Sequence, residues 1–275
     1  MIVCPLCRQP LVPDGASHAC AAGHRFDQAR EGYLNLLPVQ HRRSRAPGDN
    51  TDMVRARRAF LDAGHYHPLR DAVMAILGEL APQRLLDIGC GEGYYTQAMA
   101  DAVPAVTGID IARDAVRLAA RRDARVRWLV AGSARLPLAD HSIDAACSLF
   151  SPLPVAELLR VLVPGGHLLV ATPAPDHLQA LRAVLFDEVR PHRPDKFIGE
   201  LAPALQPAGQ REIRFPMVLD RTAREQLLTM TPYGWRASPA RRLLLCGPAS
   251  AETMTVSAAF SLLVFRAGGN ATPAA

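Results

Sequence analysis

The chain has 275 residues, of which 49% are hydrophobic, and it carries a net charge of +5. This length fits one large domain, or a core domain with a small accessory module. No apolar run approaches the roughly 20 residues of a membrane-spanning helix. Because the N-terminus also lacks the charged and apolar regions of a signal peptide, we expect a soluble cytoplasmic protein with no membrane partner.

A cysteine and histidine cluster occupies the first part of the chain. Cys4 and Cys7 form a Cys-x-x-Cys knuckle, and Cys20 and His24 follow as a second close pair. Two such pairs supply the four sulfur and nitrogen ligands of a tetrahedral zinc ion, with no position left for a catalytic water. The pattern predicts one structural zinc ion. His18 is an alternative fourth ligand, although the spacing of Cys20 and His24 is the more usual one.

A polar and basic stretch follows, over residues 38–65. We expect it to be a basic linker or helical segment. Its arginines are candidate contacts for nucleic-acid phosphates, although such a segment can equally be a solvated surface. The candidates are Arg42, Arg43, Arg45, Arg57 and Arg58.

From residue 66 onward, helical and strand patterns alternate. This order predicts a mostly parallel sheet covered on both faces. Predicted strands are 84–88, 105–109, 126–130, 143–149 and 167–172, with a late β-rich run at 255–265. Predicted helices are 69–80, 94–102, 112–121, 155–162 and 176–189, and residues 163–166 are expected to form a turn.

A glycine loop follows the first of these strands. Gly89, Gly91 and Gly93 lie between this strand and the next helix, where glycines let the backbone turn tightly and approach a ligand. A dehydrogenase can also carry such a loop. However, Asp87 stands before the first glycine, and the third glycine comes two residues after the second, unlike the dinucleotide-binding fingerprint.

Further residues recur in the order expected for a nucleoside site. Asp110 ends the second strand about 20 residues later, where a carboxylate can accept ribose hydroxyls, although it could also be a strand-end turn residue. Ser133 and Ala134 are small residues after the third strand, where an adenine ring could lie. Together these features resemble the class I methyltransferases. The resemblance implies a Rossmann-like, doubly wound α/β sheet and S-adenosylmethionine as cofactor.

A more specific resemblance extends over essentially the whole chain. It is carried by the stretches 4–7, 23–27, 31–40, 57–66, 87–96 and 230–235. In these the chain resembles the 23S rRNA (guanine-N1)-methyltransferase family, RlmA or RrmA. The resemblance implies methylation of a guanine in hairpin 35 of 23S rRNA, and a homodimer. Stretches 37–45 and 92–96 resemble the housekeeping branch rather than the branch that confers resistance to tylosin-like macrolides.

The same resemblance places cofactor contacts at Tyr66, Gly91, Glu92 and His177. From the residues alone, Tyr66 could instead be a packing aromatic, and His177 a helix residue without a ligand. The chemistry needs a group that removes the guanine N1 proton. His177, Asp176 and Glu92 are candidates, but the sequence nominates none of them.

Phe150 follows the fourth strand, where related enzymes hold the target base. Its ring could stack on a guanine drawn out of the hairpin, or it could point into the core. The predicted organisation is a zinc-binding RNA-recognition module at 1–37, the basic segment at 38–65 and a methyltransferase domain at 66–275. Two alternative functions remain: a small-molecule methyltransferase, and a zinc-stabilised RNA-binding protein without activity.

Overall fold

The computed structural model describes residues 1–38, 48–194, 199, 201 and 205–268. Its strands are β1 (Val12–Asp14), β2 (Ser17–Ala19), β3 (Arg25–Asp27), β4 (Leu34–Asn35), β5 (Arg84–Ile88), β6 (Ala105–Asp110), β7 (Arg127–Val130), β8 (Ile143–Leu149), β9 (Leu162–Pro173), β10 (Leu205–Asp220) and β11 (Thr253–Ala267). Its helices are α1 (Thr51–Asp62), α2 (His67–Leu80), α3 (Tyr94–Ala102), α4 (Arg113–Arg122), the 3₁₀ turn η2 (Ser133–Arg135), α5 (Val155–Val161), α6 (Gln179–Leu185), α8 (Arg221–Met230), α9 (Pro232–Arg236) and α10 (Pro239–Cys246).

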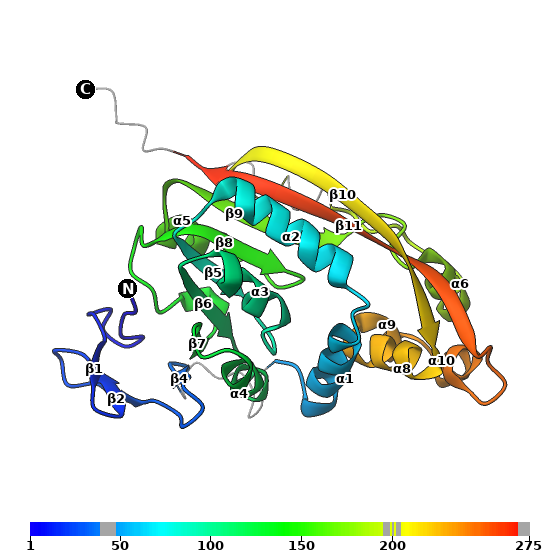
Figure 1. Cartoon of the computed structure of the whole chain (residues 1–275), viewed down its shortest axis with the longest axis horizontal. Coiled ribbons are helices and arrows are strands. Elements are labelled where there is room, and N and C mark those ends of the chain that lie inside the picture. Colours follow the sequence, from blue (N-terminus) through cyan, green and yellow to red (C-terminus); the bar gives the residue numbers. More distant parts are fainter. Residues whose placement is uncertain (39–47, 195–198, 200, 202–204, 269–275) are drawn as a thin grey trace.

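An eight-stranded sheet forms the centre of the molecule, with the strand order β10-β11-β9-β8-β5-β6-β7-β4 (Figure 1). The strands from β9 to β4 run parallel, whereas β11 is antiparallel to both of its neighbours. The chain winds from β5 toward β7 on one side and from β8 toward β9 on the other. In open sheets of this kind, ligands bind at the carboxyl ends of the strands flanking such a switch point, here β5 and β8.

Each face of the sheet packs into its own core. On one face, residues such as Leu85 and Cys147 pack with apolar residues of α2, α3 and α4. On the other face, Leu86 and Ala146 pack with α5 and with residues of the N-terminal module, including Ile2 and Leu11. The N-terminal module therefore occupies a place that helices usually cover in a doubly wound sheet.

The N-terminal module is joined to the sheet by backbone pairing as well as by packing. Strands β1, β2 and β3 form a small antiparallel sheet of their own. The two-residue strand β4 then pairs in parallel with β7, so Leu34 lies opposite Leu129 at the edge of the large sheet. A short antiparallel bridge between Ile2 and Leu138 adds a second connection.

The predicted parallel sheet is confirmed, two local predictions are wrong, and one strand was missed. Residues 163–166 do not form a turn but lie within β9, where the pairing with β8 shifts register and Gly165 has a φ of +78°. The helix predicted at 176–189 is only α6, because Leu178 before it has a φ of +52° and Phe186 after it is extended. Strand β10 was not predicted at all.

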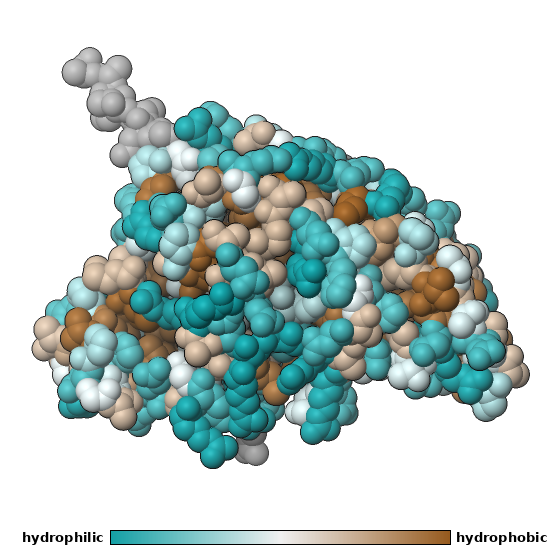
Figure 2. Space-filling view, in the orientation of Figure 1, coloured by the Kyte–Doolittle hydropathy of each residue, from teal (hydrophilic) through white to brown (hydrophobic). Residues whose placement is uncertain are grey.

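Helix α1 forms in the basic segment and lies near the carboxyl ends of the parallel strands, between α4 and α8 (Figure 1). Asn50 caps its N-terminus by accepting a hydrogen bond from the Met53 amide. Its buried residues are Val54, Phe60 and Leu61. On the face drawn in Figure 2, hydrophilic residues gather over α1 and α4. No helix of the described residues is long and apolar enough to cross a membrane.

Candidate active site and metal centre

Four potential zinc ligands meet in the N-terminal module. The ligand atoms of Cys4, Cys7, Cys20 and His24 all lie within 4.8 Å of one another. The Cys4 Sγ to His24 Nδ1, Cys7 Sγ to Cys20 Sγ and Cys20 Sγ to His24 Nδ1 distances are 3.5, 3.6 and 3.4 Å. A tetrahedron around zinc, with bonds of about 2.0–2.3 Å, has edges of roughly 3.3–3.8 Å. These four residues therefore fit a structural zinc ion.

The other candidate ligand, His18, lies outside this cluster. It sits on β2, and its Nδ1 is buried without a hydrogen-bond partner among the described residues. The ligand set is thus the one that the spacing of Cys20 and His24 predicts.

The glycine loop after β5 adopts a backbone that favours glycine. Gly89, Gly91 and Gly93 have φ values of +73°, +56° and +86°. A Cβ on Gly89 would lie 2.4 Å from the Cβ of Ser151, and one on Gly93 would lie 2.9 Å from the Trp128 ring. Next to Gly91, by contrast, the space is open. The loop is therefore tightly packed at both ends and leaves room at its centre, as a nucleoside-binding loop requires.

Asp110 ends β6 beside this open position. Its two carboxylate oxygens accept hydrogen bonds from the amides of Gly91, at 3.0 Å, and Ala112, at 2.8 Å. Burial raises the pKa of this carboxyl group, while the two amides act in the opposite direction. Each carboxylate oxygen can accept a further hydrogen bond, so Asp110 is placed to receive ribose hydroxyls.

Asp87 lies beneath the loop rather than in the open space. It is buried, and it accepts a hydrogen bond of 2.6 Å from the Thr96 hydroxyl on α3. Burial raises its pKa to about 7, against the effect of the Thr96 hydrogen bond. Asp87 therefore ties the end of β5, just before the glycine loop, to α3.

Glu92 forms a buried ion pair. Its carboxylate lies 2.8 Å from the guanidinium of Arg122 at the end of α4, and Arg122 also pairs with Asp62 of α1 at 2.9 Å. Burial raises the pKa of Glu92, and the charge of Arg122 opposes that rise. The pair joins the cofactor loop to α4 and α1. Ser133 and Ala134 lie in η2, which follows β7 at the same edge of the sheet.

Three predicted site residues meet at one aromatic side chain that the sequence did not single out. The rings of Tyr66, His177 and Phe150 lie 5.1, 4.5 and 5.4 Å from the ring of Phe260 on β11. Tyr66 and His177 are buried. Burial raises the pKa of Tyr66 and lowers that of His177 to about 3. Two predicted cofactor contacts and the predicted base-stacking residue thus belong to one cluster.

Phe150 contacts the core residue Phe260 but is not itself buried. It is 46% exposed at the carboxyl end of β8, and its backbone has a φ of +63°. A bulky residue in this region is strained, and such strain persists where the surroundings fix it. The next residue, Ser151, provides part of that fixation, because its hydroxyl lies 2.6 Å from the Ile88 carbonyl and 2.8 Å from the Ser148 hydroxyl.

The predicted phosphate contacts have different surroundings. Arg57 pairs with Asp49 and donates to the carbonyl of Met230 at the end of α8, so it holds α1 in place. Arg58 is exposed and pairs with Asp62 one turn later. Arg42, Arg43 and Arg45 lie outside the described residues.

Comparison with known proteins agrees with this geometry. A family model described as the N-terminal part of RlmA matches residues 2–45, and one described as a methyltransferase domain matches residues 85–166. The chain is 38% identical to a 23S rRNA (guanine(748)-N(1))-methyltransferase of Streptomyces fradiae, over 87% of this chain and 89% of the relative. It is 37% identical to a Micromonospora griseorubida protein, named provisionally as a 23S rRNA (guanine-N(1)-)-methyltransferase, over 96% of each chain.

Solved structures share the fold at low sequence identity. The YcgJ protein of Bacillus subtilis is 20% identical with a TM-score of 0.51, covering 75% of this chain and all of that one. The N-methyltransferase NodS of Bradyrhizobium japonicum, in complex with S-adenosyl-L-homocysteine, is 15% identical with a TM-score of 0.50, covering 79% and 99%. Fold and glycine loop together define a class I methyltransferase that uses S-adenosylmethionine. Within that class, the chain belongs to the 23S rRNA (guanine-N1)-methyltransferase family, RlmA.

Three residues of this site carried no usable sequence signal. Phe260 lies in an apolar strand where any aromatic residue reads as core. The role of Ser151 is visible only in the structure, where a Cβ on Gly89 would clash with its side chain. Arg122 is one of two adjacent arginines at the end of a helix, and the sequence does not show that this one is turned toward Glu92.

Proposed function

We propose that the protein transfers a methyl group from S-adenosylmethionine to N1 of a guanine in hairpin 35 of 23S rRNA. The observation that carries the proposal is the combination, in one chain, of a four-ligand zinc cluster, a glycine loop with open space at Gly91, and the exposed aromatic residue Phe150. Relatives that match 87% and 96% of the chain are named as 23S rRNA (guanine-N1)-methyltransferases, the second provisionally. Hairpin 35 rests on the family resemblance as a whole, and the housekeeping branch rests on two short stretches, 37–45 and 92–96.

In this proposal the protein chiefly orients the two reactants. Bound at the glycine loop, S-adenosylmethionine supplies an electrophilic methyl group. Gly91, Asp110, Ser133 and Ala134 would hold the nucleoside end, and Tyr66, Glu92 and His177 the remainder. Phe150 offers an exposed ring at the carboxyl end of β8, beside Ser151 and Gly89. A guanine stacked there would face the cofactor loop, which is the arrangement that in-line transfer needs.

The three candidate bases differ in their ion-pair partners and in their pKa values. Asp176 pairs with Arg214, which holds its pKa below the usual range, and Glu92 pairs with Arg122. His177 is neutral, but a pKa of about 3 makes its imidazole a weak base. We infer that the N1 proton leaves to solvent and that none of these three side chains sets the rate.

A basic surface next to the site would receive the RNA. Arg55 and Arg58 are exposed on α1, and Arg113, Arg117 and Arg121 are exposed on α4. These helices pack against each other, and Figure 2 shows hydrophilic residues gathered over both of them. Arg42, Arg43 and Arg45, which lie between the N-terminal module and α1 in sequence, are further candidates for phosphate contacts. The family resemblance supports a homodimer acting in the cytoplasm.

The test is methyl transfer by the purified, zinc-loaded full chain to a hairpin 35 transcript, with N1-methylguanosine mapped by reverse transcription. A methyl group on N1 blocks the Watson–Crick edge, so we expect a stop at one guanine that disappears when that guanine is replaced by adenosine. Transfer to small acceptors but not to RNA would instead indicate a small-molecule methyltransferase. Binding of the hairpin without any transfer would indicate a non-catalytic RNA-binding protein.

A further inference from the structure

The loop Leu136–Asp140, between η2 and β8, is hydrogen-bonded along its whole length. The Leu136 and Leu138 carbonyls each accept hydrogen bonds from both Arg8 and Arg160. The Pro137 carbonyl accepts from the Val3 amide at 3.0 Å, and the Leu136 amide donates to Glu157 at 2.6 Å. Asp140 pairs with both arginines, at 3.2 and 2.7 Å. The loop is therefore held from two sides, by α5 and by the N-terminal module.

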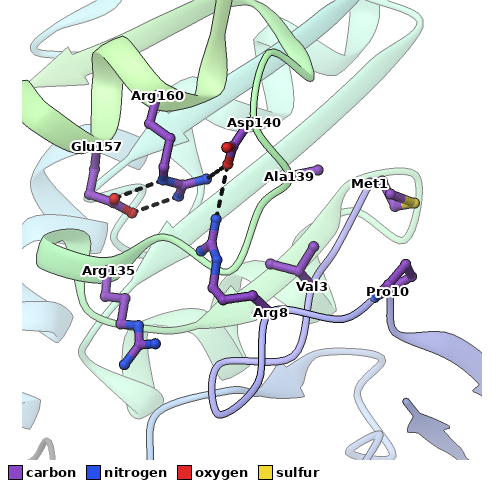
Figure 3. Close-up of a pocket in the computed structure, with 9 residues that line it drawn as sticks. All are labelled: Met1, Val3, Arg8, Pro10, Arg135, Ala139, Asp140, Glu157 and Arg160. Atoms are coloured by element: carbon purple, nitrogen blue, oxygen red, sulfur yellow. Dashed lines mark hydrogen bonds and ion pairs between the residues drawn. The ribbon is translucent and has the colours of Figure 1, made fainter. Parts of the chain in front are cut away.

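Figure 3 shows how the two arginines meet. The Arg8 and Arg160 guanidinium groups approach the Asp140 carboxylate from different elements, while the Arg135 side chain is turned away from them. These residues line a pocket of about 590 Å³ where the zinc module meets the methyltransferase domain. Arg8 makes three of the contacts that cross this boundary, to Leu136, Leu138 and Asp140.

The position of Arg8 depends on the zinc knuckle. Arg8 directly follows the ligand Cys7, and its amide donates to the carbonyl of the ligand Cys4 at 2.9 Å. Its φ of +65° lies in the left-handed region, which an arginine seldom adopts unless its surroundings impose it. The knuckle turn imposes this conformation, and the conformation directs the guanidinium to the loop.

On the other side, the loop continues directly into the proposed cofactor site. Leu136 is bonded to Arg135, the last residue of η2, and η2 contains Ser133 and Ala134. Leu136 and Leu138 are also fully or almost fully buried, so the loop cannot shift without disturbing the core. A movement of Leu136 would therefore be passed on to the turn that receives the adenine.

We propose that Arg8 is a positioning residue that couples the zinc knuckle to the proposed cofactor site, so that zinc and the nucleoside each bind more tightly in the presence of the other. The inference rests on the proposed function, because it assigns the adenine to η2. Such coupling is reciprocal, so the factor by which zinc strengthens nucleoside binding equals the factor by which the nucleoside strengthens zinc binding. Measured couplings are commonly about 5- to 150-fold.

The experiment measures zinc affinity of the full chain by competition with a chromophoric chelator, with and without saturating S-adenosylhomocysteine. For the unaltered protein we expect the nucleoside to tighten zinc binding by about tenfold. Arg8→Ala should reduce this factor to about one, and Arg8→Lys, whose single ammonium cannot reach three acceptors, should reduce it in part. Arg160→Ala should weaken nucleoside binding, measured by calorimetry, without removing a contact of the knuckle.

Arg25→Ala is the matched control. Arg25 lies in the same module on β3, but it pairs with Asp14 within that module. The Arg25→Ala variant should keep the full coupling factor. If the nucleoside binds but leaves zinc affinity unchanged, or if folded Arg8→Ala keeps the factor, the coupling is refuted while the proposed function stands. If zinc-loaded, unaltered protein does not bind the nucleoside, the proposed function itself fails.

Discussion

Gly89 and Ser151 lie so close together that no side chain fits between them. A Cβ on Gly89 would lie 2.4 Å from the Ser151 Cβ, and the Ser151 hydroxyl donates to the carbonyl of Ile88, the residue before Gly89. Ser151 also follows Phe150, the proposed platform for the target base. The glycine loop and the residues after β8, which we propose to hold the cofactor and the target base, are thus in direct contact.

We therefore expect Gly89→Ala to destabilise the protein by about 2–4 kcal/mol, since it adds a left-handed alanine to an overpacked contact. It should also weaken binding of S-adenosylhomocysteine. Urea unfolding and calorimetry measure the two effects. Gly78→Ala is the control, because Gly78 lies in α2 with open space around it, and a helical alanine there should be neutral or stabilising. Equal stability of the two variants would contradict the packing described.

Asp110→Asn should weaken nucleoside binding by about 10- to 100-fold, the loss expected for hydrogen bonds to a charged acceptor. The amide that replaces one carboxylate oxygen would also face an N–H group of Gly91 or Ala112. Calorimetric titration with S-adenosylmethionine measures the effect. Asp71→Asn, at an exposed position of α2, should bind as the unaltered protein does. Unchanged affinity in Asp110→Asn would remove the ribose assignment.

The variant Phe150→Gly tests whether the Phe150 ring serves methyl transfer or the stability of the core. Glycine relieves the left-handed strain, so stability should change by no more than about 1 kcal/mol. Loss of a stacked base should lower methyl transfer to RNA by about 5- to 150-fold, while nucleoside affinity stays the same. Phe150→Tyr should retain most of the activity. A large loss of stability with normal transfer would show that the ring serves the core.

Asp87 should make stability depend on pH. Its folded pKa of about 7 is raised above the ordinary value of 3.8 by burial, so the folded state binds the extra proton between those values. Stability then falls as pH rises through this window. Relative to Asp87→Asn, the free energy of unfolding should fall by roughly 2 kcal/mol between pH 5.5 and 7. Urea unfolding of both proteins measures it, and parallel pH profiles would show that Asp87 is ionised throughout.

The pH dependence of methyl transfer tests the route of the N1 proton. If the proton leaves to solvent, the single-turnover rate should rise by about tenfold per pH unit from neutral pH upward, as more guanine becomes deprotonated. His177→Asn should keep this slope even if its rate is lower. A plateau near neutral pH that His177→Asn abolishes would instead identify His177 as the base.

Much of the fold could be predicted because the core strands and helices carry strong local patterns. The predicted bounds of β5, α3 and β8 coincide with those of the structure. Strand β10 was missed because Pro207, Gly209 and Pro216 interrupt its pattern, and a sheet tolerates them there only because β10 is an edge strand. That position at the edge is a property of the whole sheet and cannot be inferred from the segment itself.

The site residues, too, include some that the sequence predicts and some that it does not. The zinc ligands could be predicted from their spacing, because the two members of each pair are close in sequence and a single reversal of the chain brings the two pairs together. The cluster around Phe260 could not be predicted, because it brings together Tyr66, Phe150 and His177, which are far apart in the chain. Only the order of strands places β11 next to β9 and so brings Phe260 to these residues.

The parallel pairing of β4 with β7 also determines what happens to the large sheet when the N-terminal module is removed. β7 would otherwise expose its unpaired backbone groups at the margin of the sheet, and such a margin invites pairing with other molecules. Leu34 and Leu36 further cover apolar residues of that region. A fragment that begins after the N-terminal module would thus lose its protection against self-association, so the module protects the edge of the sheet as well as carrying the zinc ligands.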